Sequence, residues 1–213
     1  MKKILFGVIA LISVSAASAQ KKKVNRDLIS RTGDHFMLQL TSDHWFGVPD
    51  SISGHLKSLS RGGNIYVLLD QRFKSSPQWS VAFGLGVGTS NMYFKRMSVD
   101  IKAKTNKLPF NNLDTLNFYK KYKLTTAFLE IPLELRFTAN PEKENKSIKA
   151  ALGVKVGTLI NVHTKGKTLQ DKDGRTVNSY TAKETGKGFF NATRLMGTAR
   201  IGYGNFSLVG AYQ

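Results

Sequence analysis

The sequence predicts an all-β fold, an antiparallel up-and-down transmembrane β-barrel of about eight strands. Hydrophobic residues recur with a period of two, which is the side-chain period of a β-strand. The connections between these periodic segments alternate between long and short, and aromatic residues gather at the ends with short connections. Outer-membrane barrels share this arrangement, with short turns on one side of the membrane and longer loops on the other.

Residues 124–137 show the two faces of a predicted strand most clearly. Hydrophobic side chains occupy one face: Leu129, Ile131, Leu133, Leu135 and Phe137. The other face is ionic around one proline: Glu130, Pro132, Glu134 and Arg136. A helix would scatter both sets around its circumference. In a soluble sandwich the hydrophobic face would be the core, whereas in a membrane barrel it would contact lipid and the ionic face would line the lumen.

The same alternation predicts six further strands. In chain order, the seven predicted strands cover residues 34–43, 64–73, 79–94, 124–137, 148–163, 193–203 and 206 onward. In the third, bulky residues from Trp79 onward alternate with serine, alanine and glycine. In the fifth, Ile160 and Val162 are expected on the hydrophobic face, and Asn161 and His163 on the face of Lys155.

Turn-forming residues and loop lengths divide the connections into two classes. Short turns are expected at residues 74–78, 140–146 and 204–205. A long loop without regular structure is expected at residues 43–63, and long polar loops are expected at residues 95–121 and 164–191. If 74–78 closes a hairpin, it brings Phe73 and Trp79 together on the hydrophobic face. Pro132 has no N–H to donate to the sheet, so it predicts a bulge or local irregularity in its strand.

The number of strands predicts that one is missing. The seventh strand stops at Gln213. A sheet in lipid must close, because an open edge leaves backbone groups unpaired in hydrocarbon, and bacterial barrels have even strand counts. We therefore expect the chain to be truncated at its C-terminus, lacking roughly one loop and one strand of the complete barrel.

The N-terminus has the pattern of a cleaved secretory signal peptide. Lys2 and Lys3 precede a short apolar run, and a small-residue cleavage site ends at Ala19. We predict a signal peptide at 1–19, a basic lead at 20–33 and the barrel domain at 34–213. The chain has no cysteine, so neither a disulfide framework nor a lipid-anchored cysteine is expected.

The net charge of the chain indicates which classes of molecule it could bind. It is +18 for the whole chain, and removing the two signal-peptide lysines leaves +16. In an exported protein this charge favours phosphorylated lipid headgroups or polyanionic glycans. We expect outer-membrane lipid and lipopolysaccharide as partners and no nucleic acid. Many of the lysines lie in the long loops, which would either contact lipopolysaccharide phosphates or be solvated.

Two sets of candidate residues follow from the predicted faces. The first is an ionic network expected to fill the lumen: Asp70, Arg72, Glu130, Glu134, Arg136, Lys155, Arg194 and Arg200. The second is an aromatic girdle at the short-turn end: Phe36, Phe73, Trp79, Phe137, Tyr203 and Phe206. If Phe137 opposes Ile148, the register places Glu130 opposite Lys155.

No catalytic, metal or cofactor site is expected. Glu130 and Glu134 would lie about 13 Å apart along one strand, too far for a glycosidase pair. The histidines lack metal-ligand spacing, and the serines lack a matching His and Asp pattern. We therefore interpret the inward charges as structural pairs.

Several segments together resemble the small PorT-like outer-membrane β-barrel proteins of Gram-negative bacteria. They are SVAFGLGVGTSNMYF (80–94), FLEIPLELRF (128–137), AALGVKVGTLINV (150–162) and RIGYGNFSLVGAYQ (200–213), behind a signal peptide. The resemblance covers most of the mature chain. It implies insertion by the barrel-assembly machinery and permits a link to protein secretion, and the family usually continues through one more strand.

The leading hypothesis is a non-enzymatic outer-membrane barrel with a plugged lumen. Its role would be structural or adhesive, or it would assist an envelope complex. The alternative is a soluble exported β-barrel that binds a small ligand or an anionic glycan.

Overall fold

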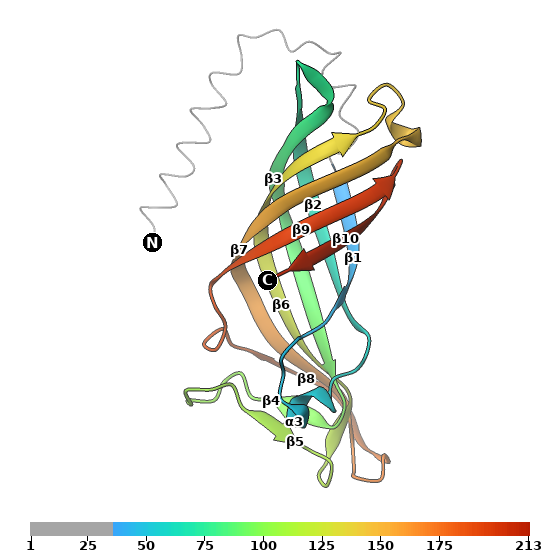
Figure 1. Cartoon of the computed structure of the whole chain (residues 1–213). Helices are drawn as coiled ribbons and strands as arrows, with labels where there is room; N and C mark the ends of the chain where they lie inside the picture. Colours follow the sequence, from blue (N-terminus) through green and yellow to red (C-terminus); the bar gives the residue numbers. More distant parts are fainter. Residues whose placement is uncertain (1–35) are drawn as a thin grey trace. The chain divides into compact units, whose positions relative to one another are not determined.

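A single curled antiparallel sheet dominates the computed structural model, which describes residues 36–213 (Figure 1). Its strand order is β1 (Phe36–Asp43), β2 (Ser60–Phe73), β3 (Ser76–Phe94), β6 (Phe118–Thr138), β7 (Ile148–Gln170), β9 (Thr193–Tyr203) and β10 (Phe206–Tyr212). These strands pair in sequence order, which is up-and-down topology and confirms the predicted all-β, antiparallel class. The predicted signal peptide and basic lead lie outside the described residues.

The long connections contain more regular structure than the sequence predicts. β4 (Met97–Val99) and β5 (Phe110–Asn112) form a separate two-stranded sheet inside the second long loop. In the third, β7 continues to Gln170 and β8 (Thr176–Thr185) pairs with it. The first contains the short helix α3 (Asp50–Ser53), and the turn before β7 contains the 3-10 helix η2 (Glu144–Lys146). The expectation that the first long loop lacks regular structure is therefore wrong, and the two later loops contain strands that the sequence did not predict.

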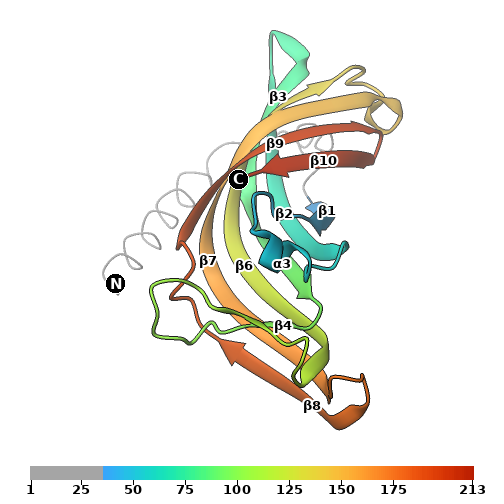
Figure 2. The ribbon, with the colours of Figure 1, turned by 60° about the horizontal axis from the view of Figure 1, so that its bottom comes forward.

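The curl of the sheet gives it a concave inner face and a convex outer face (Figure 2). Along β6, Glu130, Pro132 and Glu134 are buried, while the alternating Leu129, Ile131, Leu133 and Leu135 are exposed. The ionic face of the predicted strand is thus the inner face, and its hydrophobic face is the outer one.

A β-bulge in β7 changes which residues face inward. Phe128 of β6 pairs with Leu159, but the preceding Ala127 pairs with Asn161, so Ile160 is an extra residue. Beyond the bulge, Val162 is fully buried on the inner face and His163 shares the outer face with Asn161, to which its ring is hydrogen-bonded. The expected faces of Val162, Asn161 and His163 are therefore wrong, because the bulge shifts the alternation by one residue.

Pro132 interrupts pairing without shifting the register. Between β3 and β6, Phe83 pairs with Leu133 and Gly86 pairs with Glu130, with no paired residues between them. The proline has no N–H to donate there. The local irregularity expected at Pro132 is a gap in the ladder, and the bulge lies at Ile160.

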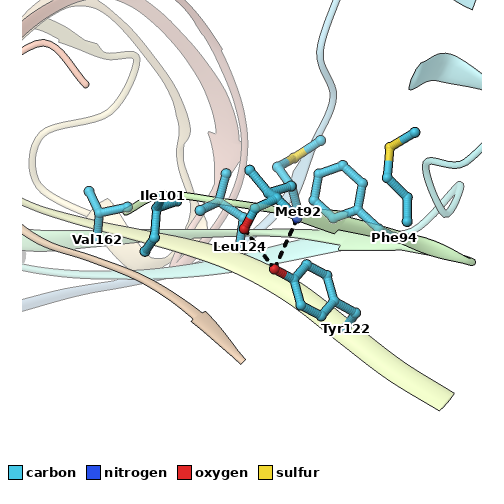
Figure 3. Packing of buried hydrophobic residues seen from close by; sticks show 8 residues of the cluster. Met92, Phe94, Ile101, Tyr122, Leu124 and Val162 are labelled. Atoms are coloured by element: carbon cyan, nitrogen blue, oxygen red, sulfur yellow. Dashed lines mark hydrogen bonds between the residues drawn. The ribbon is translucent and has the colours of Figure 1, made fainter. Parts of the chain in front are cut away.

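A hydrophobic cluster lies on the inner face at the end with the long loops, and Figure 3 shows its side chains packed together. Its members come from the three longest strands and from the segment of β4: Met92, Phe94, Met97, Val99, Ile101, Tyr122, Leu124 and Val162. The Tyr122 hydroxyl donates to the Val99 carbonyl at 2.9 Å and accepts from the Val99 N–H at 3.0 Å. The loop segment is thereby held against the inner face by packing and by two hydrogen bonds.

Candidate functional site

Five residues form one row across the inner face, with large side chains separated by glycines. Tyr66 of β2 pairs with Gly86, Gly86 with Glu130, Glu130 with Gly157, and Gly157 with Arg194 of β9. A Cβ at Gly86 would overlap the Tyr66 ring, and one at Gly157 would lie 3.2 Å from Arg194 Cγ. The glycines therefore give the three large side chains room to meet over the middle of the sheet.

Glu130 is the centre of this row. Its side chain is fully buried and accepts a hydrogen bond from the Tyr66 hydroxyl on Oε2. Arg194 donates to Oε1 from both Nε, at 3.1 Å, and Nη2. Lys155 Nζ lies 3.7 Å from Oε2 and donates to the Tyr66 hydroxyl at 3.1 Å. Two cations and a phenol thus surround one carboxylate, as a buried charge requires.

A second group forms around Glu134. Its Oε2 accepts hydrogen bonds at 3.0 Å from Arg136 Nε and from Arg200 Nη2. Arg136 Nη1 also lies 3.9 Å from Asp70 Oδ1. Arg200 Nη1 lies 3.6 Å from the sulfur of Met37, which joins β9 to β1 across the concave face. The second group therefore contacts a side chain of β1, a strand at the edge of the sheet.

The predicted contact between Glu130 and Lys155 is present, but the predicted register is wrong by two residues. Phe137 pairs with Ala150, so Lys155 lies opposite Pro132 and Glu130 lies opposite Gly157. Both charged residues remain on the inner face because a shift of two preserves the alternation. The long lysine side chain covers the diagonal distance.

Arg72 lies at the short-turn end of the inner face. It forms an ion pair with Glu144 in η2 and donates to the Pro141 carbonyl at 3.4 Å. Lys149 Nζ is 4.0 Å from the other Glu144 oxygen. The turn between β6 and β7 is thereby tied over this end of the sheet.

All eight predicted ionic residues lie on the inner face, in the two groups and at the short-turn end. Tyr66 and Glu144 also belong to these groups, although neither was among the predicted residues. Tyr66 alternates with Asp70 and Arg72, so the period of two already placed it inward. Glu144 lies in a turn, where no periodic signal exists. Among the described residues, no three His, Asp or Glu side chains gather closely enough to hold a metal ion.

The outer face carries an apolar band across neighbouring strands. Its exposed members on the four central strands include Ile65, Val67, Leu69, Phe83, Leu85, Val87, Leu129, Ile131, Leu133, Leu135, Leu152, Val154 and Val156. Exposed patches of this size on soluble monomers are rare. The band therefore requires a nonpolar environment or a partner.

The predicted aromatic residues lie at the edge of this band, with one exception. Trp79 pairs with Phe137, and their ring centroids are 5.1 Å apart. Tyr203 pairs with Phe206 beside the turn between β9 and β10. Phe36 is the exception, because it pairs with Val67. Val67 precedes Phe73, the last residue of β2 before the turn, by six residues. The expected meeting of Phe73 and Trp79 is wrong, because a register shift after Arg72 pairs Phe73 with Ser76.

Comparison with known proteins identifies one family. The family model of the outer membrane protein beta-barrel domain matches residues 33–211. Searches of curated proteins and of solved structures returned no match. None of the helices in the described part of the chain is both long enough and apolar enough to cross a membrane. With the family model covering most of its length, the chain belongs to the outer membrane protein beta-barrel domain family.

Proposed function

We propose that the chain forms a non-enzymatic, integral outer-membrane β-barrel whose lumen is plugged by its own side chains. The observation that carries the proposal is the chemical difference between the two faces of one sheet. The outer face exposes an apolar band, while Glu130, Glu134, Arg136 and Lys155 are buried on the inner face. A barrel in lipid needs this distribution, because its outside meets hydrocarbon and its inside does not.

Three layers of contacts support the plugged lumen. The pair of Arg72 with Glu144 lies at the short-turn end, the two carboxylate groups lie in the middle, and the cluster around Tyr122 lies at the long-loop end. In small barrels such side chains fill the interior and leave no wide channel. We therefore expect no wide conducting channel through the barrel.

The role of such a barrel would be structural or adhesive, or it would assist an envelope complex. The resemblance to PorT-like barrels extends this proposal to protein secretion, with insertion by the barrel-assembly machinery. Support for a non-enzymatic role comes from the carboxylates, since both Glu130 and Glu134 are engaged by basic side chains. No observation favours the soluble ligand-binding alternative.

The direct test is membrane extraction of the full chain expressed with its N-terminal segment in a Gram-negative host. We expect the protein to remain in the outer-membrane pellet after an alkaline carbonate wash and to enter solution only with detergent. Release by carbonate, together with partition into the aqueous phase of a detergent phase separation, would contradict the proposal.

The girdle proposal predicts the membrane depth of Trp79. The chain has two tryptophans, and Trp45 packs among the loops against Phe94 and Phe110. In a Trp45→Phe variant reconstituted into vesicles, we expect fluorescence quenching to be strongest with lipids brominated near the glycerol backbone, because tryptophan rings favour the membrane interface. Strongest quenching at the bilayer centre, or no quenching, would place Trp79 elsewhere.

A further inference from the structure

A row of lysines crosses the outer face beyond the apolar band, at the end with the long loops. Lys123 of β6 pairs with Lys165 of β7, and Lys165 pairs with Lys183 of β8. Lys121 and Lys167 are paired in the same way two residues further from the band. Residues directly opposite in an antiparallel sheet have Cβ atoms about 5 Å apart. The row therefore holds three positive charges side by side.

The alternation in each strand places these lysines on the outer face. The neighbours of Lys123 and Lys165 that face inward, Leu124 and Thr164, are buried. Glu184 follows Lys183 but pairs with Thr164, so it lies on the inner side of the sheet. The β7–β8 hairpin that carries Lys183 is closed by hydrogen bonds around Asp171, whose N–H donates to the Arg175 carbonyl at 2.9 Å. The lysine row is thus part of a defined sheet.

The lysine row has no acidic partner within the described part of the chain, where none of its members makes an ion pair. Lys123 Nζ instead donates to Asn91 Oδ1 at 2.6 Å and lies 5.9 Å from the centre of the Tyr93 ring. Its pKa is lowered by partial burial and by the positive charges of Lys165 and Lys167. Like charges directly opposite in a sheet destabilise it. A bound anion would remove this repulsion.

The distance of the row from the apolar band indicates which anion fits. Leu129, in the band, and Lys123 are six residues apart on β6. That separation is about 20 Å along the strand and about 15 Å along the membrane normal at the usual strand tilt. Uncharged polar residues lie between them on the outer face, in paired positions: Asn91, Thr125 and His163. Along the strand, the outer face is therefore first apolar, then polar and then cationic. This order matches a membrane leaflet in which hydrocarbon is followed by phosphorylated sugars.

We propose that the row of Lys123, Lys165 and Lys183 binds the phosphate groups of a glycolipid headgroup of the lipopolysaccharide class in the outer leaflet. This inference rests on the proposed membrane location and goes beyond it by naming a site and a ligand chemistry. The ammonium groups supply the positive charge, and the long, flexible lysine side chains can adjust to the positions of the phosphates. The general attraction of a basic protein to anionic lipid would need no such row.

The test is a titration of the refolded full chain in detergent micelles with short-chain lipopolysaccharide that carries phosphorylated inner sugars, read by native mass spectrometry. The variant is Lys123→Gln/Lys165→Gln/Lys183→Gln. The control with the same loss of charge is Lys102→Gln/Lys104→Gln/Lys107→Gln, which changes three exposed lysines between β4 and β5. The same glycolipid after phosphatase treatment and inorganic phosphate alone are the ligand controls.

We expect the row variant to lose affinity at least about tenfold, since each lysine near an anionic surface adds to the attraction. The affinity of the control variant should stay within about twofold of the wild-type affinity. The wild type should bind the phosphatase-treated glycolipid as weakly as the row variant binds the intact glycolipid. Inorganic phosphate should not compete with the glycolipid for binding. Without glycolipid, the row variant should unfold at the same or higher urea concentration, because repulsion is removed; a purely structural role predicts the reverse.

An equal loss of affinity in the row variant and the control variant would assign the effect to net charge and would contradict the proposed site. Equal binding of the phosphatase-treated glycolipid would overturn the phosphate contact, and competition by inorganic phosphate would overturn the lipid source. The single variant Lys165→Gln, in the middle of the row, gives the same comparison if the triple variant does not refold. A chain that folds without detergent contradicts the membrane proposal, whereas a detergent-dependent chain without phosphate selectivity contradicts only the glycolipid site.

Discussion

Replacing Glu130 with glutamine should lower the free energy of unfolding by about 3–5 kcal/mol, the usual effect of removing one partner from a buried ion pair. The substitution keeps the size of the side chain and its ability to accept a hydrogen bond from Tyr66. It removes the negative charge that compensates Lys155 and Arg194, both of which have side chains that are mostly buried. Urea unfolding of the protein refolded in detergent, followed by tryptophan fluorescence, measures the change.

Two further variants separate this effect from a general loss of charge. Glu142→Gln removes a carboxylate from an exposed turn position and should change stability by less than about 0.5 kcal/mol. Adding Lys155→Met to Glu130→Gln should restore part of the loss, because one uncompensated cation is replaced by an apolar side chain of similar length. A Glu130→Gln protein as stable as the Glu142→Gln protein would contradict the structural role of the network.

Replacing Gly86 with alanine should destabilise the sheet by about 1–3 kcal/mol, the typical cost of overpacking. A Cβ at this position would overlap the Tyr66 ring and the Ile65 carbonyl oxygen, and the latter belongs to the backbone and cannot rotate away. The Tyr66 hydroxyl would also move from Glu130. The measurement is the urea midpoint, together with the near-UV circular dichroism of the tyrosines.

Gly197→Ala is the matched control for the glycine prediction. Gly197 is also a strand glycine, in β9, and a Cβ there would meet no atom within 4 Å. Alanine at this position should leave stability unchanged or raise it slightly, because glycine is entropically costly in a strand. Similar losses from both substitutions would show that glycine flexibility, and not the space above Gly86, decides the outcome.

The sequence could predict the strands whose faces differ chemically. In β6 and β9 the alternation of apolar and ionic residues is uninterrupted, and the structure places their faces as expected. The long loops could not be predicted in the same way. Met97, Val99 and Ile101 do alternate, but the segment is short and surrounded by lysines and asparagines, so only its packing against the inner face reveals its strand.

The partners within the inner face were harder to predict than the face itself. The period of two determines which face of the sheet a side chain points to. The pairing register of a strand depends on the turn that precedes the strand. The turn before β7 contains η2, which shifted the true pairing by two residues from the expected one. Glu144 joins the ionic groups because that turn folds over the end of the sheet, and a turn residue carries no periodicity by which to recognise it.

The extra residue at Ile160 has a consequence for the two lysines on either side of it. Lys155 and Lys165 are both odd-numbered residues of β7, and an unbroken strand would direct both to the same side. With the bulge between them, one neutralises a carboxylate in the interior and the other faces outward beside Lys123. A single inserted position therefore accompanies the change of environment along one strand. Straightening β7 with Ile160 retained would turn Lys165 toward the interior, whereas deleting Ile160 would keep both lysines on their present faces.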